Sequence, residues 1–371
     1  MQLFKQFTKI NLFHDIQSFA TTVKIDEKDF ILATKSVFEK HLRVLNLPAH
    51  IIFRSDYGHS EPTDIMTDAL IEDFRKTDCK RIIAIGGGSV IDMAKVLMLK
   101  SEGNTEDIFL RRVPIIKEHQ LIAVPTTCGA GSEVSSVSIV SLTRKSTKVG
   151  LADDAITPDY AALIPDLLTD MPYNIFVTSA IDALIHAIES FVCPKANRYT
   201  DLFSEEATRT IVKGFSSIRA EGKEARYRLF EDFLIASNMA GIAFANAGTG
   251  AVHAMSYPLS TKYGVTHGEA CYQMFTAVFQ EYQQQKPKGK IQRIILLLAD
   301  ILNCETAEVF FKLEELLQNI IPRQPLREYG MKEEEIEEFA DNVIELQERL
   351  LSQSYVRFSR ETMCRIYRAL F

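Results

Sequence analysis

A β-rich run that ends in three consecutive glycines constrains this chain more than any other feature. Residues 81–85 read Arg-Ile-Ile-Ala-Ile, Gly86–Gly88 follow directly, and a helix-forming segment begins after Ser89. Glycines let backbone N–H groups approach a bulky anion because no Cβ atom intervenes. We expect Ser89 to be the N-cap of the helix, with Asp92 in the capping-box position. A strand, a glycine-rich turn and a helix N-terminus together favour a phosphate-binding loop over a simple tight turn.

The glycine loop differs from two common nucleotide-binding motifs. It is not the G-x-G-x-x-G of an ordinary Rossmann fold, and it lacks the Lys-Ser/Thr of a P-loop. The triple glycine therefore indicates a pyrophosphate loop of another kind. Asp92 carries a charge that would repel phosphate, so any contact it makes with a cofactor should be to a ribose or an amide.

A second loop of small residues follows the strand predicted at residues 121–124. It reads P-T-T-C-G-A-G-S-E over residues 125–133, and its hydroxyls and glycines suit the remainder of a dinucleotide. Cys128 has no base beside it in the sequence and is interpreted as a packed thiol. Lys148 is a candidate for bonding ribose hydroxyls, with an ordinary exposed lysine as the alternative.

Short β-rich runs alternate with helical segments over the first half of the chain. The predicted strands are residues 30–34, 51–53, 81–85, 121–124, 137–142 and 161–164, and the predicted helices are residues 36–45, 64–76 and 90–99. This alternation is typical of parallel βαβ units. Residues 1–168 are therefore predicted to form an α/β, Rossmann-like dinucleotide-binding domain, with an edge strand in the polar segment before residue 25.

Long periodic segments replace the strands after Pro165. Helices are predicted at residues 174–192, 198–218, 223–243, 252–257, 269–282, 291–302, 306–321, 332–351 and 360–370. Residues 169–371 are therefore predicted to form an all-helical metal-binding domain. A doubly wound sheet binds ligands beyond the carboxyl ends of its strands, so the active cleft is expected where that edge faces the helical domain.

Four side chains in the helical half suggest a metal site. Asp182 and His186 are four residues apart in a helix-forming run, which places them on one helix face. An exposed i,i+4 pair is the alternative, but the run is apolar nearly all round and is expected to be buried, where Asp and His need partners. The histidines that follow in the chain are His253 and His267. One carboxylate and three imidazoles would make a four-ligand site with room for a substrate oxygen.

Charge and cysteine usage exclude several classes of protein. A net charge of −7 and a pI near 5.7 argue against a nucleic-acid or anionic-membrane partner. The sequence has no apolar run of the length a membrane span needs and no signal-peptide pattern. The six cysteines show no C-x-x-C and are interpreted as reduced thiols of a cytoplasmic protein.

The four motifs G-G-G-S-x-x-D-x-A-K, P-T-T-x-G-x-G-S-E, D-A-x-x-H-A-x-E and H-x(13)-H-G occur here in one order. In this order and spacing they resemble the iron-dependent (group III, metal-containing) alcohol dehydrogenase family, over essentially the whole chain from about residue 25. The resemblance implies a two-domain fold like that of dehydroquinate synthase, with a metal between the domains. The family's metal ligands carry over to Asp182, His186, His253 and His267. Its nucleotide loops carry over to Gly86, Gly87, Gly88, Ser89, Thr126, Thr127 and Ala130, with Asp92 and Lys148 as supporting contacts.

The resemblance also implies the cofactors and one departure from the family. NAD is the expected nucleotide, and NADP is left open because Lys35, after the first strand, would not repel a 2′-phosphate. A ligand set without thiolate favours Fe²⁺, with Zn²⁺ as the alternative. Many members have a histidine near the reacting centre where this chain has Tyr257. A tyrosine can donate a hydrogen bond but does not buffer protons near pH 7, so a histidine relay is in doubt.

The resemblance implies hydride transfer between the nucleotide and a short-chain alcohol or aldehyde. Segments such as D-A-L-I-H-A-I-E-S look most like members that act on 4-hydroxybutyrate and succinate semialdehyde. Alternatives are a propanediol, lactaldehyde or butanol type, a dehydroquinate-synthase-like lyase, or a nucleotide sensor without activity. Lys262 is a candidate for the substrate carboxylate, and Glu189 is either a supporting partner of the metal ligands or a surface charge. A homodimer or higher homo-oligomer is expected, since an edge strand is a ready pairing surface.

Overall fold

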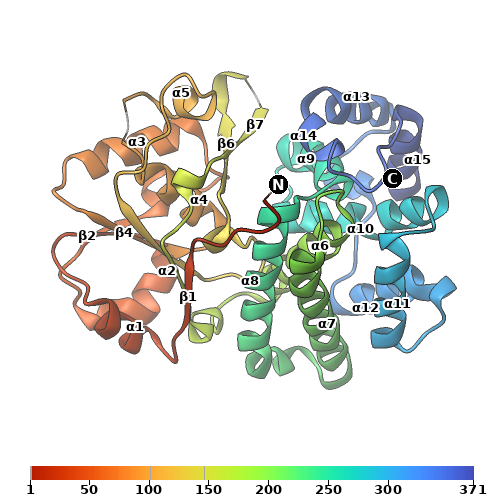
Figure 1. Ribbon diagram of the computed structural model, residues 1–371, viewed down its shortest axis with the longest axis horizontal. Coiled ribbons are helices and arrows are strands. Elements are labelled where there is room, and N and C mark those ends of the chain that lie inside the picture. Colours follow the sequence, from red (N-terminus) through yellow and green to blue (C-terminus); the bar gives the residue numbers. More distant parts are fainter. Residues whose placement is uncertain (1, 101, 146) are drawn as a thin grey trace. The chain divides into compact units, whose positions relative to one another are not determined.

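The computed structural model describes residues 2–100, 102–145 and 147–371. The chain divides into two compact units, one from Gln6 to Met171 and one from Pro172 to Phe371 that also takes in the first few residues (Figure 1). The sequence placed those first residues in the α/β domain. They pair instead with helix α8 (Phe230–Ala247), because the Lys5 N–H donates to Asn246 Oδ1 at 2.8 Å and Asn246 Nδ2 donates to the Lys5 carbonyl at 3.0 Å.

The α/β unit is built on a six-stranded sheet in which every adjacent pair is parallel, as the alternation predicted. Its order is β1-β8-β5-β4-β2-β3. The strands are β1 (Lys9–Leu12), β2 (Asp29–Ala33), β3 (His50–Phe53), β4 (Arg81–Gly86), β5 (Gln120–Pro125) and β8 (Tyr160–Leu163). The N-terminal segment supplies the edge strand β1, as expected. Gly86 pairs with Pro125, so the glycine loop and the second loop leave the same edge of the sheet side by side.

Alternate residues of the central strands enter two separate cores. Leu32, Ile82 and Leu121 join the core covered by α3, α4 and α5, whereas Ile31 and Ile83 join the core covered by α1 and residues 35–45. The period of two carries successive side chains to opposite faces, so near-continuous apolar strands are buried on both sides. The sheet is thereby fixed between two helical layers (Figure 1).

The helices of this unit are α1 (Ile16–Val23), α2 (Lys35–Val37), α3 (Asp64–Arg75), α4 (Gly88–Leu97) and α5 (Thr105–Phe109). An antiparallel hairpin of β6 (Val137–Leu142) and β7 (Thr147–Ala152) lies outside the main sheet. The expectation that Ser89 caps α4 is wrong. Gly87 is the N-cap, because its backbone is extended and its carbonyl accepts the N–H groups of Val90 at 3.0 Å and Ile91 at 3.2 Å.

The second unit has helices and no strand among the residues that the structure describes. Its α-helices are α6 (Tyr173–Val192), α7 (Arg198–Glu221), α8, α9 (Ala251–Tyr263), α10 (His267–Gln285), α11 (Lys290–Leu302), α12 (Val309–Ile320), α13 (Ile336–Leu346), α14 (Glu348–Leu351) and α15 (Arg360–Leu370). Helix α6 packs against α7, α8 and α10. Of the described helices it alone has the length and hydropathy of a membrane span, but 89% of that window is buried and it carries Asp182, His186 and Glu189, as expected of a core helix.

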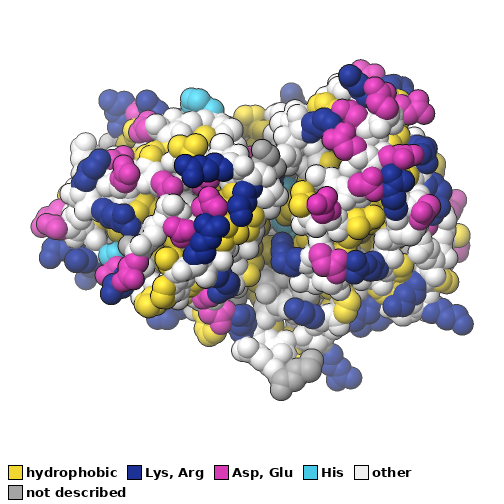
Figure 2. All heavy atoms as spheres, turned by 90° about the horizontal axis from the view of Figure 1, so that it is seen from above, with side chains coloured by type: hydrophobic (Ala, Val, Ile, Leu, Met, Phe, Trp, Pro, Cys, Tyr) yellow, Lys and Arg dark blue, Asp and Glu magenta, His cyan; other side chains and the backbone are white. Residues whose placement is uncertain are grey.

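Basic and acidic side chains are intermixed on the surface of each unit seen in Figure 2. No extended basic area appears on that face. This distribution agrees with the net charge of −7.

Candidate functional site

Helix α6 buries the first two predicted metal ligands. Asp182 is 4% exposed and His186 is 6% exposed, and His186 Nδ1 lies 3.9 Å from Asp182 Oδ2. The apolar residues around them are buried on every side of the helix. The alternative of an exposed i,i+4 pair is therefore wrong.

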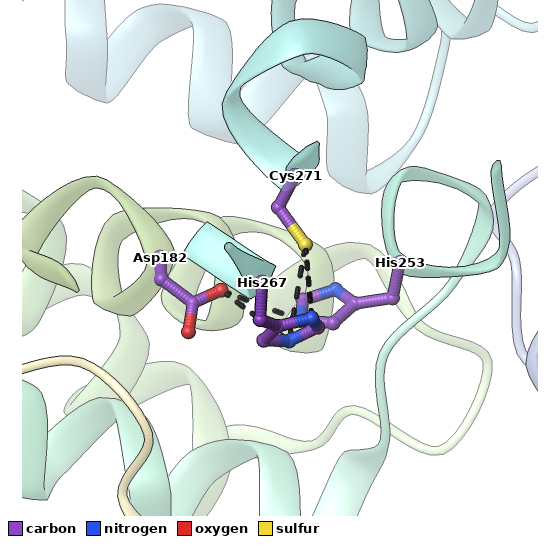
Figure 3. Close-up of side chains that lie close together, drawn as sticks. All are labelled: Asp182, His253, His267 and Cys271. Carbon is purple, nitrogen blue, oxygen red and sulfur yellow. Dashed lines mark hydrogen bonds and ion pairs between the residues drawn. The ribbon is translucent and has the colours of Figure 1, made fainter. Parts of the chain in front are cut away.

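The other two histidines come to the same place from different helices. His253 on α9 has Nε2 3.7 Å from Asp182 Oδ1 and 2.9 Å from His186 Nε2. His267, the first residue of α10, has Nε2 3.8 Å from Asp182 Oδ1. The structure thus brings together all four residues singled out in the sequence, from three helices of one unit. Figure 3 shows three of them, Asp182, His253 and His267.

Gly268 allows α10 to come this close to α6. A Cβ atom at this position would lie 2.5 Å from the Thr178 carbonyl oxygen and 3.3 Å from Asp182 Cβ. Backbone cannot move aside as a flexible side chain could, so any other residue would push His267 away from Asp182. The glycine after His267 is a packing requirement of the site.

The donor atoms fit a divalent cation. Asp182 Oδ1 is buried and has no hydrogen-bond partner in the described part of the chain. Burial raises the pKa of Asp182 to about 7, with His253 and the Cys271 thiol opposing that rise. A buried carboxylate facing imidazole nitrogens needs a compensating positive charge. One carboxylate and three imidazoles are ligands that first-row divalent ions accept.

Glu189 supports this cluster from inside the helical unit. It is 1% exposed, its Oε2 lies 2.6 Å from His253 Nδ1, and its Oε1 accepts the Val252 N–H at 2.8 Å. Burial alone would lower the pKa of His253, but the hydrogen bond and negative charge of Glu189 raise it overall. A carboxylate on Nδ1 presents Nε2 to the other ligands. Glu189 is therefore a supporting partner, and its interpretation as a surface charge is wrong.

Two more side chains lie beside the histidines. Cys271 Sγ is 3.9 Å from both ring nitrogens of His267 and points toward the cluster (Figure 3). Sequence reasoning missed it, although its i,i+4 spacing from His267 repeats that of Asp182 and His186. Tyr257, which stands where many family members have a histidine, has its ring centroid 6.1 Å from that of His267.

The two predicted nucleotide loops lie against each other in the α/β unit. The Thr126 N–H donates to the Gly86 carbonyl at 3.1 Å. A Cβ atom on Gly87 would lie 3.3 Å from Thr127 Cγ2, and one on Gly88 would lie 2.7 Å from Ala130 Cβ. The loops form one surface of backbone and small side chains, with Ser89 in the first turn of α4. The N-cap Gly87 brings no side-chain hydrogen bond, which leaves this helix start suited to an anion.

The predicted supporting residues of this surface have protein partners. Asp92 accepts hydrogen bonds from Ser132 Oγ at 2.5 Å and from the Ile139 N–H at 3.0 Å, and so ties α4 to the β6–β7 hairpin. Lys148 forms an ion pair with Glu61. These contacts give both residues structural roles.

Lys95, the last residue of the motif G-G-G-S-x-x-D-x-A-K, belongs to the same network, although no role was predicted for it from the sequence. Its ammonium donates to Ser132 Oγ at 2.8 Å and Ser135 Oγ at 3.1 Å, and it lies 3.6 Å from Asp92 Oδ1. In the helical unit, the Lys262 ammonium lies 2.8 Å from Glu335 and 3.1 Å from Glu338, which already balance its charge.

Comparison with known proteins agrees with this geometry. Residues 13–165 match the model of iron-containing alcohol dehydrogenases, and residues 176–371 match that of the Fe-containing alcohol dehydrogenase family, C-terminal. The 4-hydroxybutyrate dehydrogenase of Clostridium kluyveri is 47% identical over 371 residues, all of both chains. The iron-containing alcohol dehydrogenase of Thermococcus thioreducens is 26% identical with a TM-score of 0.84, covering 99% of each chain. The sulfoacetaldehyde reductase of Bifidobacterium kashiwanohense, solved with NAD⁺, shares the fold with a TM-score of 0.84 at 23% identity over 99% of this chain and 98% of that one. The chain therefore belongs to the iron-containing alcohol dehydrogenase family.

Proposed function

We propose that this protein transfers a hydride between NAD(H) and the pair 4-hydroxybutyrate and succinate semialdehyde. The observation that carries the proposal is the convergence of Asp182, His186, His253 and His267 in a chain that is 47% identical over its whole length to a 4-hydroxybutyrate dehydrogenase. Other alcohol dehydrogenases of the family are the alternative.

Asp182 and the three histidines would hold the metal ion in this reaction. A bound divalent cation would act as a Lewis acid on the substrate oxygen. Glu189 keeps the proton of His253 on Nδ1, so that Nε2 is free to serve as a ligand. Tyr257, whose ring centroid lies 6.1 Å from that of His267, would hydrogen-bond the substrate oxygen through its hydroxyl and is not suited to relay protons. Fe²⁺ is our first choice of ion and Zn²⁺ the second.

The glycine loop and the residues 126–130 would hold the dinucleotide. Backbone N–H groups at the start of α4 suit the pyrophosphate, and the small side chains at Thr127 and Ala130 keep the approach open. We propose NAD as the nucleotide. The Lys35 ammonium lies 5.5 Å from the ring centroid of Phe53. Its positive charge would not repel the 2′-phosphate of NADP.

A substrate panel tests the proposal. Metal-loaded enzyme should oxidise NADH with succinate semialdehyde at a kcat/KM at least about tenfold above that for butanal, the neutral aldehyde of the same chain length. NADPH should replace NADH poorly. Equal rates with both aldehydes would overturn the substrate proposal, and no turnover on any short aldehyde would overturn the activity.

We also propose a cytoplasmic homo-oligomer assembled through β1. This edge strand is exposed along its length, with Ile10 40% and Leu12 49% exposed, and an uncovered apolar edge is a pairing surface. The six cysteines are thiols and not disulfides in this structure, which suits a reducing compartment. Light scattering should report a dimer or larger, and Ile10→Lys should shift it toward the monomer.

A further inference from the structure

We propose that Cys271 is an additional metal ligand, which places a sulfur donor in a site otherwise made of nitrogen and oxygen. This inference rests on the proposed metal site and concerns which atoms form it. Sγ of Cys271 and donor atoms of Asp182, His253 and His267 all lie within 4.8 Å of one another. The thiol points into the group from α10 (Figure 3).

The separations match those of ligands around one ion. With bonds of about 2.0 Å to nitrogen or oxygen and about 2.3 Å to sulfur, ligands at tetrahedral angles stand about 3.3–3.6 Å apart. Together with His186 the site then has five candidate donors, a number that zinc sites can reach. Here His253 Nε2 and His267 Nε2 lie 3.7 and 3.8 Å from Asp182 Oδ1, and Sγ lies 3.9 Å from His267 Nε2. These three separations exceed the tetrahedral values by a few tenths of an ångström, and every other separation in the group stays within 4.8 Å.

A second observation marks this position as that of a cation. Asp182 Oδ1 is buried, faces the two imidazole nitrogens and has no hydrogen-bond partner among the described residues. The thiol therefore points toward the position where a cation would compensate the charge of a buried carboxylate oxygen.

The protein can accommodate the sulfur as a thiolate. Cys271 now donates its S–H to Ser256 Oγ at 3.3 Å, and Ser256 donates to the His253 carbonyl at 2.8 Å. With a metal ion bound, Cys271 would be a thiolate that has released its proton to solvent, and the Ser256 hydroxyl could rotate to donate to the sulfur. A soft donor would favour Zn²⁺, Co²⁺ or Fe²⁺ over Mg²⁺ or Mn²⁺.

Cobalt substitution tests the assignment directly. The full-length protein, stripped of metal and loaded with Co²⁺, should show a sulfur-to-cobalt charge-transfer band in the near ultraviolet beside the visible d–d bands. Cys271→Ser should lose the charge-transfer band and keep the d–d bands. The matched control is Cys364→Ser, since Cys364 is also buried but lies on α15 outside the cluster, and its spectrum should equal that of the wild type.

Binding and X-ray absorption give further readouts. Zn²⁺ affinity should fall by more than about tenfold in Cys271→Ser and stay unchanged in Cys364→Ser. Even the loss of a residue that only hydrogen-bonds to a ligand lowers metal affinity by about tenfold, and loss of a ligand should lower it further. The zinc-loaded wild type should show a sulfur neighbour at about 2.3 Å, a result that needs no variant to fold. Bound Co²⁺ without a charge-transfer band, or zinc without a sulfur neighbour, would overturn the role of Cys271 alone. Failure to bind either ion would overturn the metal site itself.

Discussion

Glu189 and His253 form a buried pair in which Oε2 lies 2.6 Å from Nδ1. The two residues come from α6 and α9, so the pair joins two of the three helices that carry the proposed metal ligands. The second carboxylate oxygen accepts the Val252 N–H at 2.8 Å, which fixes the carboxylate on the turn that presents the histidine. The orientation of His253 is therefore set before any ion arrives.

Glu189→Gln should weaken metal binding while leaving the fold intact. The amide can accept the Val252 N–H but no longer supplies the negative charge that holds the His253 proton on Nδ1. We expect a loss of about 10–100-fold in Zn²⁺ affinity, measured by competition with a chelator. Glu61→Gln, in the α/β unit, is the control and should bind Zn²⁺ like the wild type. Wild-type affinity in Glu189→Gln would contradict the supporting role.

Removing the metal should make stability depend on pH through Asp182. In the metal-free protein its pKa is about 7, whereas its ordinary value is 3.8. Between these values the native state keeps a proton that the unfolded chain has released, so the free energy of unfolding falls as pH rises and stays low above 7. The expected loss is on the order of a few kcal/mol.

Urea unfolding of the metal-free protein at about pH 5.5 and about pH 8 measures this loss. Asp182→Asn cannot ionise and should show a smaller fall between the two pH values than the wild type. Parallel pH dependences for the two proteins would show that the buried carboxyl is not responsible.

Gly88→Ala should impair nucleotide binding more than Gly87→Ala. The added Cβ would lie 2.7 Å from Ala130 Cβ in the first case but 3.3 Å from Thr127 Cγ2 in the second, so only the first forces the two loops apart. Fluorescence titration with NADH should give a dissociation constant raised at least about tenfold for Gly88→Ala. Zn²⁺ affinity should be unaffected, because the ligands belong to the other unit. Equal dissociation constants for the two variants would contradict the packing argument.

Lys95→Met should destabilise the α/β unit and weaken NADH binding without affecting the metal site. The buried ammonium is bonded to Ser132 and Ser135 and lies near Asp92, and its removal leaves that carboxylate without its cation. Breaking a buried pair in this way costs about 3–5 kcal/mol in the free energy of unfolding. Lys100→Met is the control, since Lys100 is exposed and should change stability by less than about 0.5 kcal/mol.

The sequence predicted the parts of the fold that depend on periodicity and spacing. Apolar runs of strand length predicted the sheet, because parallel strands that are buried on both faces have almost only apolar side chains. The i,i+4 spacing of Asp182 and His186 in an apolar helix predicted a buried pair. Strand β7 was missed because it reads T-K-V-G-L-A, with a glycine and a lysine in place of an apolar alternation.

The remaining errors have physical causes that sequence alone hides. Ser89 is a favourable cap residue, but Gly87 takes that position because the glycine turn continues directly into the helix. Lys95 looks like a helix-surface lysine until the 132–137 segment covers it. Cys271 looks like a packed thiol, and only the meeting of α6, α9 and α10 places it among ligands. Each miss concerns contacts between segments far apart in the chain.

Because Gly268 has no side chain, the spacing of the helices and the identity of the metal-binding side chain are set by two different residues. Helix spacing is governed by this position, whereas the chemical identity of the donor is governed by its neighbour, His267. An exchange of the donor for another side chain would leave the helices where they are. Ligand identity can therefore diversify in related proteins without rebuilding the scaffold, so long as the adjacent glycine is retained.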